Sequence, residues 1–338
     1  LLHLSWQHLT SFVSTASKNQ PIAEPGEELI LVWQSPHTRK VAWKVAGDAD
    51  LLALKIIIED IDPRSAATTA DAPVSIIHAS IRKAAQEGIL VRPASRIRRD
   101  PDFAPQAVPE TRDYLSTLAF TLQWHLTQAC DLHCKHCYDR SNRTSLPLDQ
   151  AIGILDDLSG FCDKKNVEGQ VTFTGGNPLL YPRSTELYQA AADRGFMIAI
   201  LGNPTSQETI EELIAIQKPE FYQVSLEGLA AHNNDIRGTG HFDRVIEFLS
   251  LLKKMKIYSM VMLTLTAENQ DQVLPLAEFL KDKTDLFTFN RLSMVGEGAN
   301  LLGAPIQNFS SFLRDYRTHA ETNPAMSTRD SLFNIINR

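Results

Sequence analysis

The chain has 338 residues, of which 43% are hydrophobic and 22% charged, and these proportions describe a folded globular protein and exclude a disordered tail. Its formal net charge of -7 argues against a general nucleic-acid binder, although a local basic face is still compatible with it. Four cysteines are too few for a disulfide framework.

Length and hydropathy also bound the class of protein. No stretch approaches the roughly 18 consecutive apolar residues that a membrane-spanning helix needs. The first residues, LLHLSWQHLTSF, lack a basic leader and a small-residue cleavage site. We therefore expect a cytoplasmic protein without a membrane partner. At roughly 100 to 200 residues per domain, the length predicts two domains, or one large α/β domain with an appendage.

The N-terminal part of the chain predicts a small α+β domain. Residues 1–25 are expected to form a short helix and a linker, because Leu4 and Leu9 belong to an apolar pattern with helical spacing. Two apolar runs, ELILVWQ and RKVAWKVA, flank the turn-forming SPHT and predict a hairpin. Two helical patterns and the strand-like run ILVRP follow. Residues 26–98 are therefore predicted to form a winged-helix-like domain.

The rest of the chain alternates between two patterns. Residues 99–116 contain three prolines and little periodicity, which predicts a linker between domains. Residues 117–300 then contain six apolar strand patterns separated by helical ones. This alternation requires parallel pairing with right-handed crossovers, and so predicts an α/β fold, either a partial (β/α)6 barrel or a doubly wound sheet. Residues 301–338 are expected to form a C-terminal helical segment that begins a truncated extension.

Three of the four cysteines lie in one loop, ACDLHCKHCYDR, directly after the first strand of this series. Strand ends of this kind carry the active site in both candidate folds. Cys130, Cys134 and Cys137 have the spacing C-x3-C-x2-C, and such thiolates can each ligate a different iron of one cluster. The alternative is a structural zinc site, although such sites usually pair two cysteine knuckles. The histidines that could complete it are His125, His133 and His136.

The cysteine spacing resembles the signature of the radical S-adenosylmethionine (SAM) superfamily, and the resemblance covers about residues 117–300. It implies a partial (β/α)6 radical SAM barrel in which Cys130, Cys134 and Cys137 hold a 4Fe–4S cluster. It also implies that SAM chelates the open iron through its amino and carboxylate groups. Electron transfer would then cleave SAM to methionine and a 5′-deoxyadenosyl radical.

Later strand ends carry features that the same resemblance assigns to SAM. The second strand ends in Gly175, Gly176, Asn177 and Pro178, a corner that the family uses to hold the SAM ammonium. Asn177 stands where glutamate is usual, and its amide oxygen can accept a hydrogen bond without the charge of a carboxylate. The sequence therefore predicts a SAM corner with an altered polar contact.

The resemblance places further SAM contacts on other strand ends. Ser225 is expected to contact SAM, and Glu227, two residues along the same strand face, is expected in the ribose or substrate region. Arg237 is expected to hold the SAM carboxylate with its guanidinium. The remaining positions assigned to the SAM cleft are Asn203, Thr264 and Arg291. No catalytic acid, base or hydrogen donor can be assigned from the sequence.

Four segments, TGGNPLLYP, ILGNP, YQVSLEGL and NRLSMVGEG, resemble the peptide-modifying branch, particularly thio(seleno)oxazole modification maturases. Many such relatives carry auxiliary clusters in a cysteine-rich C-terminal extension, whereas no cysteine follows Cys162 here. Either the enzyme lacks auxiliary clusters, or the chain ends before that region. Residues 26–98 resemble the peptide-recognition element of these maturases. That resemblance implies that the leader of a ribosomally made precursor peptide adds to the hairpin edge.

The sequence thus predicts a radical SAM enzyme that modifies a precursor peptide and receives electrons from a reductant such as flavodoxin or ferredoxin. Two alternatives remain open. One is a radical SAM enzyme that acts on a small metabolite, which would be favoured if residues 26–98 bind no peptide. The other is a non-catalytic regulator whose winged helix binds DNA while the cysteine loop senses a metal or oxygen. It predicts metal-dependent DNA affinity and no SAM turnover.

Overall fold

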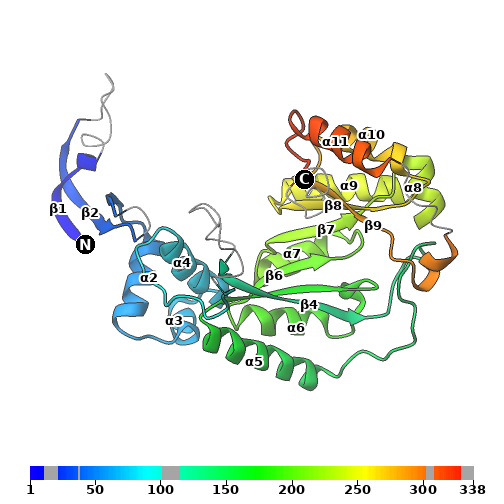
Figure 1. Ribbon diagram of the computed structural model, residues 1–338. Coiled ribbons are helices and arrows are strands. Elements are labelled where there is room, and N and C mark those ends of the chain that lie inside the picture. Colours follow the sequence, from blue (N-terminus) through cyan, green and yellow to red (C-terminus); the bar gives the residue numbers. More distant parts are fainter. Residues whose placement is uncertain (11–21, 37–38, 101–114, 302–307, 329–338) are drawn as a thin grey trace. The chain divides into compact units, whose positions relative to one another are not determined.

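The computed structural model describes residues 1–10, 22–36, 39–100, 115–301 and 308–328. The chain divides into two compact units, and in Figure 1 the first is blue to cyan except for a short green segment, while the second runs from green to red. The first unit comprises residues 1–118 with 163–167, and the second comprises residues 119–162 with 168–338. Within the described ranges, none of the helices has the length and hydropathy that crossing a membrane requires.

Within its described residues, the first unit contains an antiparallel sheet in the order β1-β2-β3 and the helices α2, α3 and α4. The strands are β1 (Leu2–Gln7), β2 (Glu24–Gln34) and β3 (Val41–Val45). The helices are α2 (Asp48–Ile58), α3 (Pro63–Ala70) and α4 (Val74–Gln86). A small core joins the helices through Ile56, Ala66, Ala67 and Ile77. The expected hairpin is therefore present, as β2 and β3, within an α+β unit.

Two local predictions in this unit are wrong. Residues 2–7 form β1 and not the expected helix, because Leu2 pairs with Ile30 of β2 and this long-range pairing outweighs a short helical pattern. The run ILVRP is no strand, because Gly88 adopts a φ of +76° and the amides of Ile89 and Leu90 donate back to Ala84. Residues 11–21 of the predicted helix and linker, and residues 101–114 of the predicted linker 99–116, lie outside the described residues.

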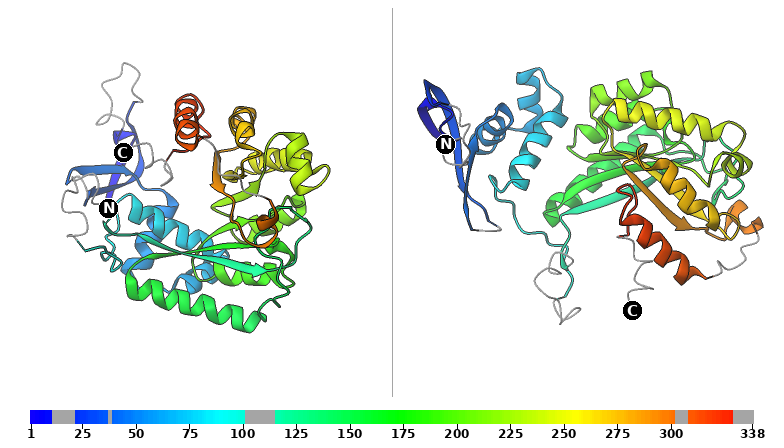
Figure 2. Two further views of the ribbon diagram at one scale, coloured as in Figure 1. Left: turned by 45° about the vertical axis from the view of Figure 1, so that its right-hand side comes forward. Right: turned by 90° about the horizontal axis from the view of Figure 1, so that it is seen from above.

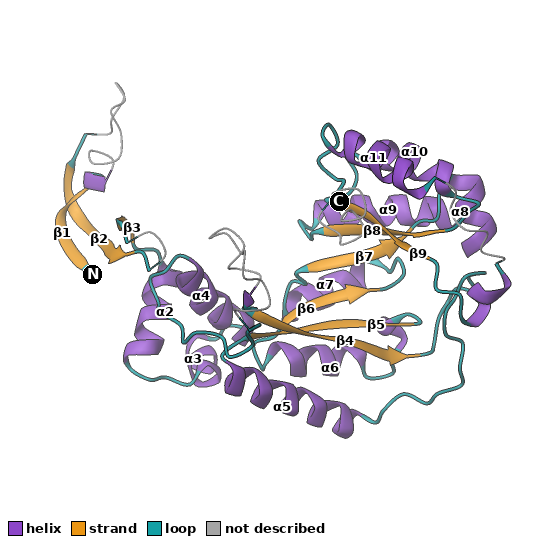
Figure 3. Cartoon of the chain, viewed as in Figure 1, coloured by secondary structure: helices purple, strands orange, loops and turns teal. Residues whose placement is uncertain are grey.

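The second unit is built on a six-stranded sheet, all parallel, in the order β4-β5-β6-β7-β8-β9. The strands are β4 (Ala119–Thr127), β5 (Glu168–Gly175), β6 (Met197–Leu201), β7 (Phe221–Ser225), β8 (Ser259–Leu265) and β9 (Leu286–Arg291). Sequential order confirms the partial (β/α)6 arrangement, because a doubly wound sheet would reverse its order at a switch point. Figure 3 shows the strands splayed as a partial barrel with the helices outside it.

Helices connect these strands and cover the outer face of the sheet, as the two rotated views in Figure 2 also show. They are α5 (Leu148–Lys165), α6 (Ser184–Ala192), α7 (Gln207–Ile216), α8 (Ala230–Arg237), α9 (His241–Lys254) and α10 (Val273–Leu280). In the predicted C-terminal segment, 301–338, α11 spans Phe309–Ala320, whereas residues 302–307 and 329–338 lie outside the described residues. Because all six strands run parallel, their carboxyl ends lie at one edge of the sheet.

Register brings the cysteine loop and the glycine corner together. β4 and β5 pair in parallel along their length, and Thr127 at the end of β4 lies opposite Gly175 at the end of β5. Apolar side chains in the strands, such as Val171, Ile198 and Val261, are fully buried and form the core of this unit. Polar residues lie at the carboxyl edge of the sheet. The sheet therefore provides a rigid base for the loops that follow each strand.

Candidate functional site

A cavity of about 800 Å³ opens at the carboxyl edge of the parallel sheet. Its wall includes the three loop cysteines, Cys130, Cys134 and Cys137. The predicted SAM contacts that also line it are Gly175, Gly176, Asn203, Ser225, Arg237 and Thr264. The structure thus brings residues from five strand ends to one cavity, whereas Glu227, which was also predicted for the ribose or substrate region, is not among the residues that line it.

The three cysteines are free thiols in different surroundings. Cys130 is exposed, Cys137 is half-buried and Cys134 is buried. Burial raises the pKa of the Cys134 thiol, and the nearby Arg237 guanidinium opposes that rise. Two N–H donors approach the sulfurs, because Asn203 Nδ2 lies 3.6 Å from Cys130 Sγ and Arg237 Nη1 lies 3.6 Å from Cys134 Sγ. These donors suit sulfur atoms that carry negative charge.

Such a donor set fits a 4Fe–4S cluster. Three thiols open on one cavity, and hydrogen bonds to cluster sulfurs are a usual feature of such centres. Within the described residues, no three His, Cys, Asp or Glu side chains are arranged to share a single metal ion. A cluster does not need that arrangement, because each cysteine ligates a different iron.

The histidines that could have completed a zinc site have other partners. His125 Nδ1 lies 2.9 Å from the Tyr138 hydroxyl and its Nε2 lies 3.1 Å from Gln128 Oε1. His133 Nδ1 contacts the guanidinium of Arg140. The third, His136, faces a carboxylate. A Cys₃His zinc site would therefore require these contacts to be broken.

The Gly175 and Gly176 corner is shaped by the cysteine loop itself. Gly175 adopts a φ of +137°, and a Cβ at Gly176 would lie 2.3 Å from the carbonyl oxygen of Ala129. The amide of Gly176 donates to Thr127 O at 2.8 Å, and that of Asn177 donates to Ala129 O at 2.7 Å. Backbone therefore lies directly on backbone, and the two glycines permit this close approach.

Asp131 joins two of the predicted SAM residues, and the sequence interpretation missed it. Its Oδ1 accepts a hydrogen bond from Asn177 Nδ2 at 3.1 Å and another from Asn203 Nδ2 at 2.6 Å. Asn177 Oδ1 in turn accepts from the amide of Leu179. Asn177 and Pro178 are both buried and neither is among the residues that line the cavity. The position of Asp131 beside Cys130 was the available signal.

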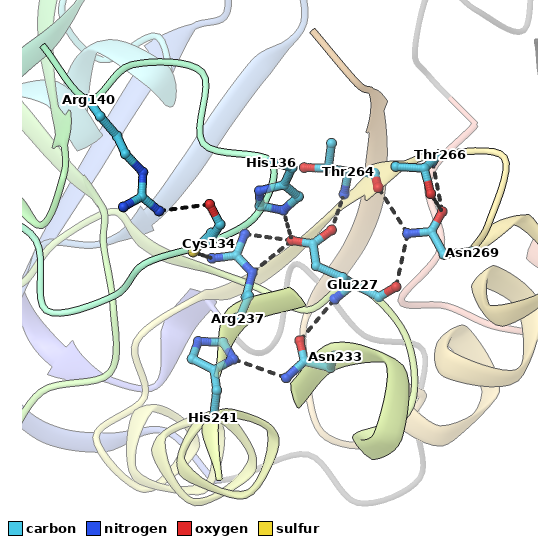
Figure 4. Close-up of polar contacts among 10 residues, drawn as sticks. All are labelled: Cys134, His136, Arg140, Glu227, Asn233, Arg237, His241, Thr264, Thr266 and Asn269. Carbon is cyan, nitrogen blue, oxygen red and sulfur yellow. Dashed lines mark hydrogen bonds and ion pairs between the residues drawn. The ribbon is translucent and has the colours of Figure 1, made fainter. Parts of the chain in front are cut away.

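Glu227 is the centre of a buried network at the end of β7 (Figure 4). Its Oε1 accepts from Arg237 Nε at 2.8 Å and Nη2 at 2.5 Å, and lies 2.9 Å from His136 Nε2. Its Oε2 accepts from the amide of Thr264 at 2.8 Å. Burial alone would raise the pKa of Glu227, but Arg237 and His136 outweigh it and hold the pKa at about 2. The carboxylate is therefore ionised and fixed.

Two buried asparagines also hold the backbone of Glu227 in place. Asn233 Oδ1 accepts from the amide of Glu227 at 3.1 Å, and Asn269 Nδ2 donates to its carbonyl at 2.9 Å. Asn233 Nδ2 lies 3.1 Å from Nδ1 of His241, which is 1% exposed. Burial first, and then the charges of Arg237 and Arg244, lower the pKa of His241 to about 4. A neutral imidazole can accept a hydrogen bond from Asn233 at this contact, which Figure 4 marks with a dashed line.

The last strand contributes a different contact from the one expected. Arg291 ends β9 with an exposed side chain whose guanidinium carbon lies 6.0 Å from the centre of the Phe309 ring, and it is not among the cavity-lining residues. Beyond it, Gly296 adopts a φ of +57°, and a Cβ there would lie 2.4 Å from Tyr138 O. Glu297 N donates to Cys137 O at 2.9 Å. This turn therefore supports the end of the cysteine loop.

Comparison with known families gives a match over this unit. The model of the Radical SAM superfamily matches residues 124–280, a span that contains the cysteine loop, the glycine corner and the Glu227 network.

Curated relatives match part of the chain. The Fe-coproporphyrin III synthase of Methanosarcina barkeri is 25% identical over 53% of this chain and 45% of its own length. Mycofactocin maturase MftC of Mycobacterium tuberculosis is 34% identical over 39% of this chain and 34% of its own length. The chain thus spans less than half the length of either relative.

Solved structures share the fold. Streptococcus suis SuiB bound to its precursor peptide SuiA has a TM-score of 0.53 and 18% identity, and the match covers 90% of this chain and 72% of SuiB. The enzyme anSMEcpe with bound AdoMet has a TM-score of 0.51 and 17% identity, over 62% of this chain and 63% of that one. At these identities the likeness concerns the fold alone.

Proposed function

We propose that this chain, whose residues 124–280 match the model of the Radical SAM superfamily, uses a 4Fe–4S cluster and SAM and modifies a ribosomally synthesised precursor peptide through a 5′-deoxyadenosyl radical. The observation that carries the proposal is the placement of Cys130, Cys134 and Cys137 on one cavity of about 800 Å³. A cavity of this size has room for SAM beside a cluster and for a substrate side chain.

We assign different roles to the residues around the cavity. Cys130, Cys134 and Cys137 would hold the cluster, and with SAM bound it would supply reductive cleavage and a radical that abstracts hydrogen. Asn203 and Arg237 direct N–H groups at two of the sulfurs. Residues at the strand ends would orient SAM and the reacting C–H bond and exclude water. They are Gly175, Gly176, Ser225 and Thr264.

The N-terminal unit would bind the leader of the peptide. SuiB, whose fold match covers 90% of this chain, has been crystallised with its precursor peptide. In this chain β3 is an edge strand, and it exposes Val41, Trp43 and Val45. An extended peptide could add to that edge by backbone hydrogen bonds and cover these side chains. We place the reaction in the cytoplasm, with a flavodoxin or ferredoxin as the reductant and no nucleic acid.

The test is anaerobic. The protein is reconstituted with iron and sulfide, SAM and dithionite are added, and 5′-deoxyadenosine is quantified beside a variant with all three cysteines changed to Ala. We expect product from the wild type and none from the variant. Equal product from both would refute the assignment of the cysteines. Metal-dependent DNA affinity without SAM cleavage would instead favour a regulator.

A second candidate is a radical SAM enzyme that acts on a small molecule. It is favoured by relatives named Fe-coproporphyrin III synthase and AdoMet-dependent heme synthase, which match at 25% and 27% identity. Titration of the whole chain with synthetic candidate precursor peptides separates the two. Binding that is lost when the β3 edge is altered supports the peptide, whereas SAM cleavage without any peptide binding supports the small molecule.

A further inference from the structure

The buried pair of Glu227 and Arg237 reaches the sulfur of Cys134. We propose that these two residues set the reduction potential of the cluster through Cys134, with the Arg237 guanidinium raising the potential and the Glu227 carboxylate behind it opposing that rise. The inference rests on the proposed function, because it requires the cluster. It concerns the ease of reduction and not the binding of SAM.

The contacts of the Arg237 guanidinium are divided between Glu227 and Cys134. Its Nε and Nη2 both donate to Glu227 Oε1, and Nη1 lies 3.6 Å from Cys134 Sγ. The side chains of Arg237 and Glu227 are only 11% and 1% exposed. The guanidinium is therefore held by one partner and directed at the other, with little water to screen its charge.

Glu227 is itself held from several elements, so it cannot follow Arg237 if the arginine moves. The amide of Thr264 at the end of β8 donates to Oε2 at 2.8 Å. His136, which lies between Cys134 and Cys137 in the loop, places Nε2 2.9 Å from Oε1. The Glu227 carboxylate, the Arg237 guanidinium and the Cys134 sulfur thus lie in a fixed order, with the positively charged guanidinium between the other two.

The sign of the effect follows from this order. Reduction adds one electron to the cluster, supplied by dithionite in the experiment, and makes the cluster and its thiolates more negative. A cation that donates a hydrogen bond to a ligating sulfur favours the reduced state and raises the potential. The carboxylate behind it reduces that effect. Removal of the Arg237 charge alone should therefore lower the potential, and removal of the Glu227 charge alone should raise it.

The experiment compares Arg237→Gln with Glu227→Gln in reconstituted full-length protein without SAM, by anaerobic redox titration with EPR detection. We expect Arg237→Gln to lower the midpoint potential and Glu227→Gln to raise it. Arg237→Gln should change the ratio of reduced to oxidised cluster at a fixed potential by about tenfold, which is about 59 mV for a one-electron couple. The change for Glu227→Gln should be smaller, because the guanidinium contacts the sulfur and the carboxylate lies behind it. A change in cluster exposure alone would not give opposite signs.

The matched control is Asp235→Asn. Asp235 is on α8, two residues before Arg237, and pairs with Lys135 at 2.7 Å on the exposed surface, so the solvent screens its charge. We expect its potential to equal that of the wild type. A double variant, Glu227→Gln with Arg237→Gln, replaces both charges by amides and should give a potential below the wild type but above Arg237→Gln.

The possible outcomes separate the two proposals. Wild-type protein that forms no cluster would refute the proposed function and this inference with it. A normal cluster whose potential is unchanged in both single variants, or moves in the same direction in both, would overturn this inference alone. Where the unpaired charge in a single variant prevents folding, the double variant decides: a lowered potential supports the inference and an unchanged one overturns it.

Discussion

Polar side chains are buried at the carboxyl edge of the parallel sheet, whereas apolar side chains are exposed on the antiparallel sheet of the N-terminal unit. Glu227 and Asn233 are 1% and 0% exposed, and hydrogen bonds satisfy both. Val41 and Val45 on β3 are 60% and 46% exposed. Each region departs from the usual partition of polar and apolar residues.

The two departures have different physical meanings. A buried polar network gives little net stability, but it allows one arrangement of its members when every group is paired. Such a region is suited to a small ligand that needs fixed contacts. An edge strand with apolar side chains on one face leaves its backbone and its surface available. That region is suited to a partner that arrives as an extended chain.

The largest expected effect concerns His241 in the buried network. Its pKa is about 4 in the folded chain, below the ordinary value of 6.5, so between these values only the unfolded chain binds the proton. Stability should therefore be complete above pH 6.5 and decline as the pH falls toward 4, by up to about 3 kcal/mol. Urea unfolding at pH 7.5, 6 and 5 measures the decline.

His241→Gln is the matched variant, because its amide oxygen can still accept from Asn233 Nδ2. We expect the free energy of unfolding of this variant to change less between pH 6.5 and pH 4.5. Glu227 also has a lowered pKa, about 2 against 4.5, but its contribution is lost only below about pH 4.5, outside this window. An equal decline in wild type and variant would show that another group controls acid stability.

An intermediate effect is expected where the glycine corner lies on the cysteine loop. In Gly176→Ala the new Cβ would lie 2.3 Å from a backbone oxygen, so the loop must shift, at a cost of about 1 to 3 kcal/mol. Gly153→Ala is the control, because this glycine lies within α5 with no atom within 4 Å of the added Cβ. There, alanine should stabilise the helix by about 0.5 to 1 kcal/mol. Thermal unfolding of both variants would show opposite signs, and a stable Gly176→Ala would mean that the corner yields easily.

Local signals were sufficient for most of the second unit. Strand and helix periodicities predicted the six β/α repeats, and the spacing of Cys130, Cys134 and Cys137 placed the site at the end of β4. Each of these signals is contained in a short stretch of consecutive residues, so it can be recognised without knowledge of distant contacts. The order of the strands then followed from the rules for crossover connections.

Long-range contacts account for what the sequence did not predict. The strand β1 depends on pairing with β2, and the apolar spacing of residues 2–7 carries no trace of that partner. Helix α3 was missed because its buried face consists only of the small side chains of Ala66 and Ala67, and its start is marked by a cap in which Asp62 accepts from the amide of Ser65. The partners of Arg237 could not be read from the sequence either, because Cys134 is 103 positions away.

The smallest expected effect on stability concerns the exposed valines of β3 in the N-terminal unit. Val41 and Val45 lie on one face of β3, so replacing both by Thr keeps the β-branched shape and removes apolar surface that water already reaches. The free energy of unfolding in urea should change by less than about 0.5 kcal/mol, while fluorescence of the apolar dye 1-anilinonaphthalene-8-sulfonate should fall. Val91→Thr, at a position 83% exposed outside the sheet, controls for a general loss of surface hydrophobicity and should leave the dye signal nearly unchanged. If the free energy of unfolding of the double variant falls by more than about 1 kcal/mol, these valines pack inside the folded protein. The β3 face would then not be an available binding surface for a peptide.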